Sequence, residues 1–296
     1  MSLVINNNMM AANAARNLGN SYNNLAKSVQ RLSSGLRVNS AADDAAGLAI
    51  RELMRADITS LNQGVRNAND AISLIQTADG SLGIIDEKLI RMKELAEQAA
   101  TGTYTADQRM MIESEYQAMA SEITRIANST DFNGVHLLNG NLSSGTHDGT
   151  GLTSTGKMKI HFGAGNDCSE DYYYIQIGDS TASALGVGNS SVAGSKAHTV
   201  STQAAAQKAL EGINDAITSK DKIRANLGAL QNRLENTVSN LQIQAENLQS
   251  AESRISDVDV STEMTTFVRN QILTQSAVAM LSQANSLPQM AMQLIG

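Results

Sequence analysis

Heptad-spaced runs of apolar residues constrain this chain more than any other feature of its sequence. A first run of such residues extends from Leu18 to Leu36 and a second from Met54 to Met92. In the C-terminal half an aliphatic residue recurs every seven positions from Leu227 to Ile255. A helix gathers such positions onto one narrow stripe. The pattern therefore predicts long helices that pair as in coiled coils. The first run has steps of four and three in alternation: Leu18, Tyr22, Leu25, Val29, Leu32 and Leu36.

The composition favours thin helical seams over a thick compact core. Aromatic residues make up 3% of the 296 residues and tryptophan is absent, whereas hydrophobic residues make up 42%. Large interiors usually draw on aromatic side chains, while alanine, leucine and methionine suit helix pairs. The net charge of −7 argues against nucleic acid as a partner, because phosphate binding needs a basic face.

A further helical segment is expected from Thr262 to Ala284, followed by Pro288, which is expected to end or kink it. A single amphipathic helix of this kind cannot offset its ordering entropy alone. Residues 1–45 and 255–296 have no further segment of the chain to cover them, so other copies are expected to do so. The apolar face of the segment contains Met264, Phe267, Val268, Ile272, Leu273, Val278 and Leu281.

The middle of the chain, about residues 141–197, changes to Gly, Ser and Thr. Asn-Gly pairs at 133–134 and 139–140 are turn signals, and the second is expected to close a hairpin. The β-rich segments 158–162 and 172–177 are expected to pair as two strands. The predicted fold class is therefore mainly α. It is a long antiparallel coiled-coil-like bundle in which the N- and C-terminal halves pair, with a small β-rich central insert.

Each candidate chemical site can also be explained by a purely structural role of its residues. The four histidines fall between residues 136 and 198 with Cys168 among them, but they lack metal-ligand spacing, so no metal or cofactor is predicted. Asp43 and Asp44 resemble paired carboxylates, yet such a pair usually offsets the dipole at a helix N-terminus. Phosphate loops and nucleophile elbows are absent, so an enzyme is not expected. The histidines are His136, His147, His161 and His198.

The chain start shows neither a basic segment nor an apolar one, so we expect no cleaved secretory signal. No apolar run approaches the ~18 residues of a membrane span, so membrane insertion is not expected. These features are typical of a cytosolic protein, or of one exported without cleavage.

Several ordered motifs resemble those of the bacterial flagellins. The family's N-terminal motif is similar to RLSSGLRVNSAADDAAG at 31–47, and DFNGV at 131–135 follows where flagellins have it. The C-terminal motif is similar to RANLGALQNRL at 224–234. Segments 271–273 and 283–285 resemble the family's terminal helix. The resemblance covers both helical halves, roughly 1–140 and 200–296.

The resemblance implies a subunit that polymerises with other copies of itself into the flagellar filament for motility. Residues 1–45 with 255–296 would form the inner filament core, 46–140 with 198–254 a helical rod with a short hairpin, and 141–197 a surface-exposed insert. It also implies type III export to an extracellular location, with an export chaperone and flagellar cap and junction proteins as partners. The terminal stripes, including Phe267, Ile272, Leu273, Val278 and Leu281, would carry polymerisation.

Flagellins recognised by Toll-like receptor 5 carry an arginine in a QRVRELAVQ setting. Here IRMKELAEQ at 90–98 aligns, which places Arg91 and Leu95 at i and i+4, and Glu115 matches the acidic partner on the next helix. The resemblance thus implies receptor recognition through these residues. The alternative is that Arg91 and Glu115 serve only packing between subunits.

Other functions remain open at this point. A hook–filament junction protein shares the terminal helices and is the main alternative. A flagellin with a metalloprotease insert would need a His-Glu-x-x-His motif, which the short insert lacks. A monomeric adhesin is suggested only by the tyrosine-rich segment at 172–174.

Overall fold

The structure is a computed structural model that describes residues 8–151, 155–167, 170–188 and 199–295, without the side chains of 287–289 and 291–295. Its helices are α1 (Met9–Ser34), α2 (Ala45–Ala100), α3 (Ala106–Ser129), α4 (Gln203–Ser256) and α5 (Val260–Ile295). The chain divides into two compact units. The terminal unit comprises residues 1–58 with 246–296, and the rod unit comprises 59–245.

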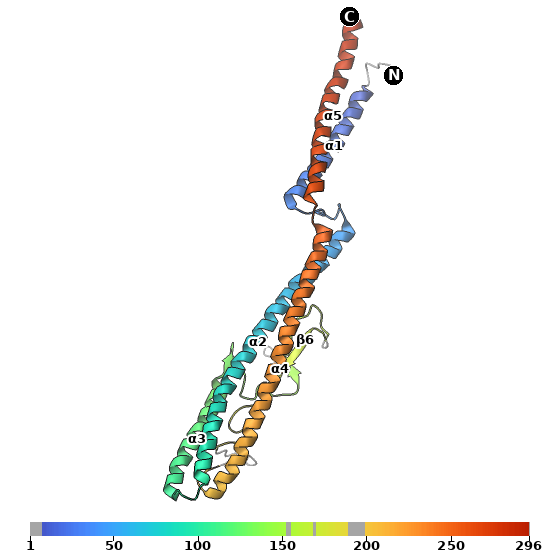
Figure 1. The fold of residues 1–296 in the computed structure, drawn as a ribbon. Coiled ribbons are helices and arrows are strands. Elements are labelled where there is room, and N and C mark those ends of the chain that lie inside the picture. The colour runs from blue at the N-terminus through green and yellow to red at the C-terminus, as the bar shows by residue number, and fades with distance from the viewer. Residues whose placement is uncertain (1–7, 152–154, 168–169, 189–198, 296) are drawn as a thin grey trace. The chain divides into compact units, whose positions relative to one another are not determined.

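In the terminal unit, α1 and α5 lie side by side as an antiparallel pair (Figure 1). The α1 helix ends at Gly35, whose φ of 72° is left-handed and whose N–H donates to the Arg31 carbonyl. After Gly35 the chain runs beside the segment that joins α4 to α5. Leu36 forms an antiparallel bridge with Asp257 there, and the Val258 N–H donates to the Gly35 carbonyl. These backbone bonds tie the ends of the two terminal helices together.

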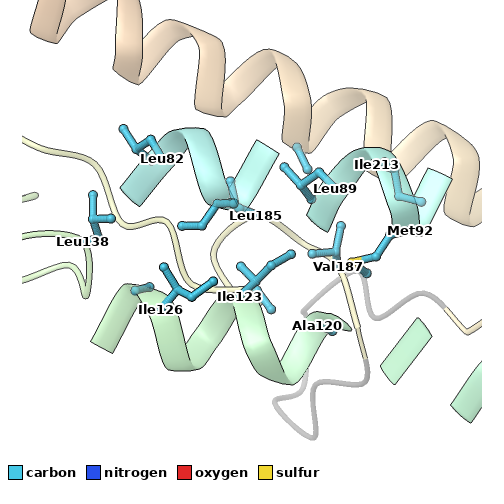
Figure 2. Close-up of a cluster of buried hydrophobic side chains, with 14 of the residues drawn as sticks. Leu82, Leu89, Met92, Ala120, Ile123, Ile126, Leu138, Leu185, Val187 and Ile213 are labelled. Carbon is cyan, nitrogen blue, oxygen red and sulfur yellow. The ribbon is translucent and has the colours of Figure 1, made fainter. Parts of the chain in front are cut away.

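The rod unit is built on the heptad stripes of α2 and α4, with α3 packed beside α2. Stripe residues of α2 from Leu61 to Met92 are buried or half-buried, and so are those of α4 from Leu227 to Leu241. Figure 2 shows Leu82, Leu89 and Ile123 in the shared cluster. The predicted pairing of the two helical halves is confirmed.

Among the described residues of the rod unit, the strands form three antiparallel pairs: β1 (Asp131–Phe132) with β2 (Val135–His136), β3 (His147–Asp148) with β4 (Thr155–Gly156), and β5 (Met158–His161) with β6 (Tyr172–Ile175). The β5–β6 register pairs Met158 with Ile175 and His161 with Tyr172. The predicted pairing of the two β-rich segments is thus confirmed.

The β1–β2 hairpin is closed by the first Asn-Gly pair. Asn133 and Gly134 have φ angles of 52° and 79°, and a two-residue turn of this kind needs positive φ at both positions. Gly140 also has positive φ, at 91°, but it lies after β2 in a bend. The hairpin expected at Asn139-Gly140 is therefore wrong among the residues described.

The central segment shares the core of the rod unit. Ile175, Ile177, Leu185 and Val187 are buried in the same cluster as the stripe of α2. After β5 the chain passes so close to α2 that a Cβ at Gly64 would lie 1.9 Å from the Phe162 carbonyl oxygen. The Asn67 side chain also donates to the His161 carbonyl, at 2.8 Å. These contacts hold the end of β5 on the helix.

Two features of the helices depart from the sequence pattern. The α5 helix continues through Pro288 to Ile295, so of the two effects expected of this proline, an end of the helix is wrong and a kink stays a prediction. The α3 helix lies outside the stripes predicted from the sequence, although its buried face repeats at steps of four and three through Ile112, Tyr116, Met119, Ile123 and Ile126. Its start also carries a sequence signal. Thr105 and Gln108 form a capping box in which each side chain bonds the other's backbone N–H. Within the part of the chain that the structure describes, no helix is long and apolar enough to cross a membrane.

Candidate functional site

The most deeply buried side chains in the seam between α1 and α5 are small or polar. Among the described side chains of the two helices, the buried ones are Ser28, Glu263, Asn270 and Ala284, at 3%, 9%, 9% and 6% exposure. A large apolar residue is not among them. The most deeply buried positions between the helices are therefore small or polar, and the larger apolar side chains of both helices keep part of their surface exposed.

Polar contacts fix the pairing at both ends of this seam. The Asn8 side chain donates to the Ala284 carbonyl at 2.8 Å and also accepts from the Ala11 N–H, which caps α1. At the other end, the Arg31 guanidinium lies 3.6 Å from the Glu263 carboxylate, with side-chain exposures of 34% and 11%. These contacts select one antiparallel register.

The predicted polymerisation residues divide between the seam and the outer surface. Half-buried side chains flank the seam, and a second group points away from it. The half-buried group is Leu18, Leu25, Leu32, Leu36, Phe267 and Leu281. The exposed group is Tyr22 (63%), Val29 (48%), Ile272 (57%), Leu273 (49%) and Val278 (52%).

Sequence reasoning missed the polar seam because it followed hydropathy alone. Ser28 lies seven residues after Ser21, and Asn270 lies seven after Glu263, so both pairs recur at heptad spacing. This repeat of polar residues beside the leucines is the signal that could have found the seam.

Arg91 on α2 bridges to Glu115 on α3. The guanidinium Nη2 and Nε donate to Glu115 Oε1 at 2.8 and 3.0 Å, and Nη1 donates to Glu94 Oε2 at 2.9 Å. The hydrogen bonds that Arg91 donates to Glu115, and then to Glu94, raise the pKa of Arg91 above its usual value. The Arg91 and Glu115 side chains are 49% and 45% exposed, so solvent or a partner can reach both.

Leu95 lies one turn after Arg91 but is 2% exposed. It belongs to the buried cluster of the rod unit, beside Met92 and Ala96. The structure therefore brings Arg91 and Glu115 together on the surface, whereas Leu95 is part of the buried core.

The remaining candidates have structural partners. Asp44 accepts from the Gly47 N–H at 2.9 Å, at the start of α2, as expected of a helix N-terminal charge. His147 and His161 lie against Tyr174 and Tyr172, with ring centroids 5.5 and 5.9 Å apart. His198 and Cys168 lie outside the described residues. Among the residues described, no group of three or more His, Cys, Asp or Glu is placed to hold a metal ion.

Comparisons with known proteins decide the family. Residues 5–143 match the family model described as the bacterial flagellin N-terminal helical region, and residues 210–295 match the flagellin C-terminal helical region. The chain belongs to the bacterial flagellin family. It is 43% identical over 293 residues to the flagellar filament 33 kDa core protein of Treponema phagedenis, covering 99% of this chain and 100% of the relative. Flagellins are structural proteins of the flagellar filament rather than enzymes.

Other relatives agree with this assignment. The flagellin of Halalkalibacterium halodurans is 40% identical over 299 residues, covering 99% of this chain and 100% of that protein. The structure of a putative flagellar hook-associated protein from Vibrio parahaemolyticus aligns with a TM-score of 0.55 and 14% identity, covering 73% of this chain and 100% of that one. At that identity the likeness concerns the fold alone. The family matches leave residues 144–209 of this flagellin uncovered, which include β3 to β6.

Proposed function

We propose that this flagellin polymerises with copies of itself through α1 and α5. The observation that supports the proposal is the distribution of apolar side chains in the terminal unit. The seam within one chain buries serine, glutamate and asparagine, while Tyr22, Ile272 and Val278 are half or more exposed. Helices whose outer faces expose apolar side chains of this size gain stability by packing those faces against neighbours. A head-to-tail interface of this kind leaves growth open and yields a filament.

The remaining assignments follow from the family resemblance. Residues 1–45 with 255–296 would form the inner layer of the filament, 46–140 with 198–254 the rod, and 141–197 the outward-facing insert. The protein would leave the cell by type III export, with an export chaperone and the flagellar cap and junction proteins as partners. Its place would then be the extracellular flagellum.

Seeded growth tests polymerisation. Purified Ile272→Ser monomer, mixed with filament fragments, is expected to need a higher concentration for growth than the parent, because Ile272 would lose apolar contacts with a neighbour. The control is Gln271→Ser, which truncates an adjacent exposed polar side chain. Light scattering gives the critical concentration, and negative-stain electron microscopy shows the filaments.

Each outcome of this experiment has a distinct meaning. Equal critical concentrations for Ile272→Ser and the parent would contradict assembly through α5. Parent particles that bind the ends of seeds without extending them would favour the alternative, a hook–filament junction protein. Long parent filaments of uniform diameter would support the filament subunit.

We further propose that Toll-like receptor 5 recognises the Arg91–Glu115 pair. The supporting observation is that both side chains are exposed on neighbouring helices and hold each other at 2.8 Å. A pre-formed, accessible charge pair of this kind suits a partner interface. Leu95 would contribute by packing under Arg91, since it is 2% exposed.

Receptor-reporter signalling by matched monomers tests this proposal. Arg91→Ala is expected to lower signalling at equal dose, because it removes the exposed cation and its bonds to Glu115. Arg125→Ala is the control, since Arg125 is also exposed and also pairs with a glutamate, Glu122 on its own helix. Equal signalling by Arg91→Ala and the parent would reject receptor recognition here and leave subunit packing as the role of the pair.

A further inference from the structure

A lysine occupies a core position in the seam of α4. One heptad series of this helix is buried over six successive positions: Ala206, Ile213, Lys220, Leu227, Leu234 and Leu241. Lys220 is 2% exposed, whereas lysine is almost never fully buried unless it is paired. The other five members of the series are aliphatic side chains.

Two ion pairs join α4 to α2 at this level. Lys220 Nζ donates to Asp86 Oδ1 at 2.5 Å and lies 2.8 Å from Asp221 Oδ1 on its own helix. One turn further along α4, Arg224 Nε and Nη2 donate to the two carboxylate oxygens of Asp79 at 2.7 and 3.1 Å. The two acids on α2 are seven residues apart, so each cation meets one of them.

The leucines of the same seam do not distinguish one register from another. Leu227, Leu234 and Leu241 recur every seven residues, so sliding α4 by one heptad replaces each leucine with the next. Such a slip moves the helix by about 10 Å, at 1.5 Å per residue. Repeated apolar seams need another element to choose among such registers, and a single polar residue in the seam is a known way to do so.

We propose that Lys220, acting with Asp86 and supported by the Arg224–Asp79 pair, fixes the register of α4 against α2. Sliding in one direction brings Lys220 level with Asp79 but sets Arg224 at Ile72. Sliding in the other direction sets Lys220 level with Lys93, although Arg224 then reaches Asp86. Each slip therefore breaks one of the two pairs between α2 and α4. The first leaves Arg224 opposite an isoleucine, and the second sets the buried Lys220, which keeps only Asp221 of its own helix, beside another lysine, so both are disfavoured.

The role is one of specificity rather than stability. Removing a charge pair from a seam in favour of apolar side chains is often neutral or stabilising for the folded state. The lysine therefore acts as a positioning residue, and the readout that identifies it is the relative position of two helices.

Distances between spin labels test this inference on the full chain in monomeric form. Labels are placed at the exposed positions Asn69→Cys on α2 and Asn214→Cys on α4, in a Cys168→Ser background. With the parent seam, electron–electron double resonance is expected to give one narrow distance. With Lys220→Met, a second population is expected, displaced by about 10 Å, because the leucines then accept the slipped register.

Two further variants make the result decisive. Lys220→Met with Asp86→Leu removes both charges, so it leaves no unpaired acid and is expected to show the second distance even if the single variant folds poorly. Lys222→Met removes an exposed lysine two residues away and is expected to keep the single parent distance. One unchanged narrow distance in the double variant would overturn the proposal.

Discussion

The two units of this flagellin use the same heptad spacing for different purposes. In the rod unit the middle of the α2 stripe is fully buried, with Leu82, Ile85 and Leu89 at 0% exposure. In the terminal unit the buried positions hold Ser28 and Asn270, and the larger apolar side chains are half-buried or exposed. The spacing alone therefore defines a helix pair, whereas the side chains at the seam decide whether the pair is stable by itself.

The largest expected effect concerns a single core side chain of the rod unit. Leu89→Ala leaves a cavity in a fully buried cluster, and such substitutions cost about 2–5 kcal/mol of unfolding free energy. Tyrosine fluorescence in guanidinium measures it, because five of the six tyrosines lie within 59–245. An unfolding free energy within about 0.5 kcal/mol of the parent would show that the rod unit is as loosely packed as the terminal pair.

The next effect tests the contact that holds β5 on α2. Gly64→Ala would place a Cβ 1.9 Å from the Phe162 carbonyl oxygen, so the strand must shift, at an expected cost of about 1–3 kcal/mol. Gly80→Ala on the same helix meets nothing within 4 Å and is expected to stabilise the protein by about 1 kcal/mol. Opposite signs in denaturant unfolding would support the contact, and two stabilising variants would refute it.

The sequence predicted the rod better than the site, for physical reasons. Helices α2 and α4 follow from their stripes, because burial and hydropathy coincide there. The seam of the terminal unit does not, since Ser28 and Asn270 are buried in spite of their polarity. The approach of Phe162 to Gly64 joins residues far apart in the chain, and a local pattern carries no record of such a contact.

In the candidate recognition site, too, one part followed from the sequence and another only from the structure. Arg91 and Glu115 were placed by motif resemblance, and the structure joins them by hydrogen bonds between α2 and α3. Spacing at i and i+4 predicted that Leu95 lies on the same face of the helix as Arg91, but spacing does not predict how deeply that face is buried. The packing of α2 in the cluster of the rod unit covers Leu95, while the longer Arg91 side chain reaches solvent.

A smaller effect is expected for the exposed residues of the terminal unit. Ile272→Ala removes a side chain that is 57% exposed in the monomer, so the unfolding free energy should change by no more than about 0.5 kcal/mol. Circular dichroism of the monomer in denaturant measures this change. A loss comparable to that of Leu89→Ala would mean that α5 is already packed in solution, and the contrast between the units would fail.

The smallest expected effect is a pH dependence at the start of α5. Asp259 accepts from the N–H groups of Ser261 and Thr262 and from the Thr262 hydroxyl, and these bonds, the hydroxyl foremost, lower the pKa of its carboxyl. A carboxyl with a lowered pKa in the folded state stabilises that state above its unfolded pKa, and this contribution is lost as pH falls through the folded value.

Acid should therefore loosen the first turn of α5, because a protonated Asp259 is a weaker acceptor for the N–H groups of Ser261 and Thr262. The amide proton shifts of Ser261 and Thr262, followed by NMR on the monomer, are expected to titrate below the ordinary aspartate pKa. Asp259→Asn keeps an oxygen acceptor for the same N–H groups but does not ionise, so its shifts should stay flat. If both proteins titrate alike, the helix start responds to another acid, and Asp259 is not the group that makes the terminal unit sensitive to pH.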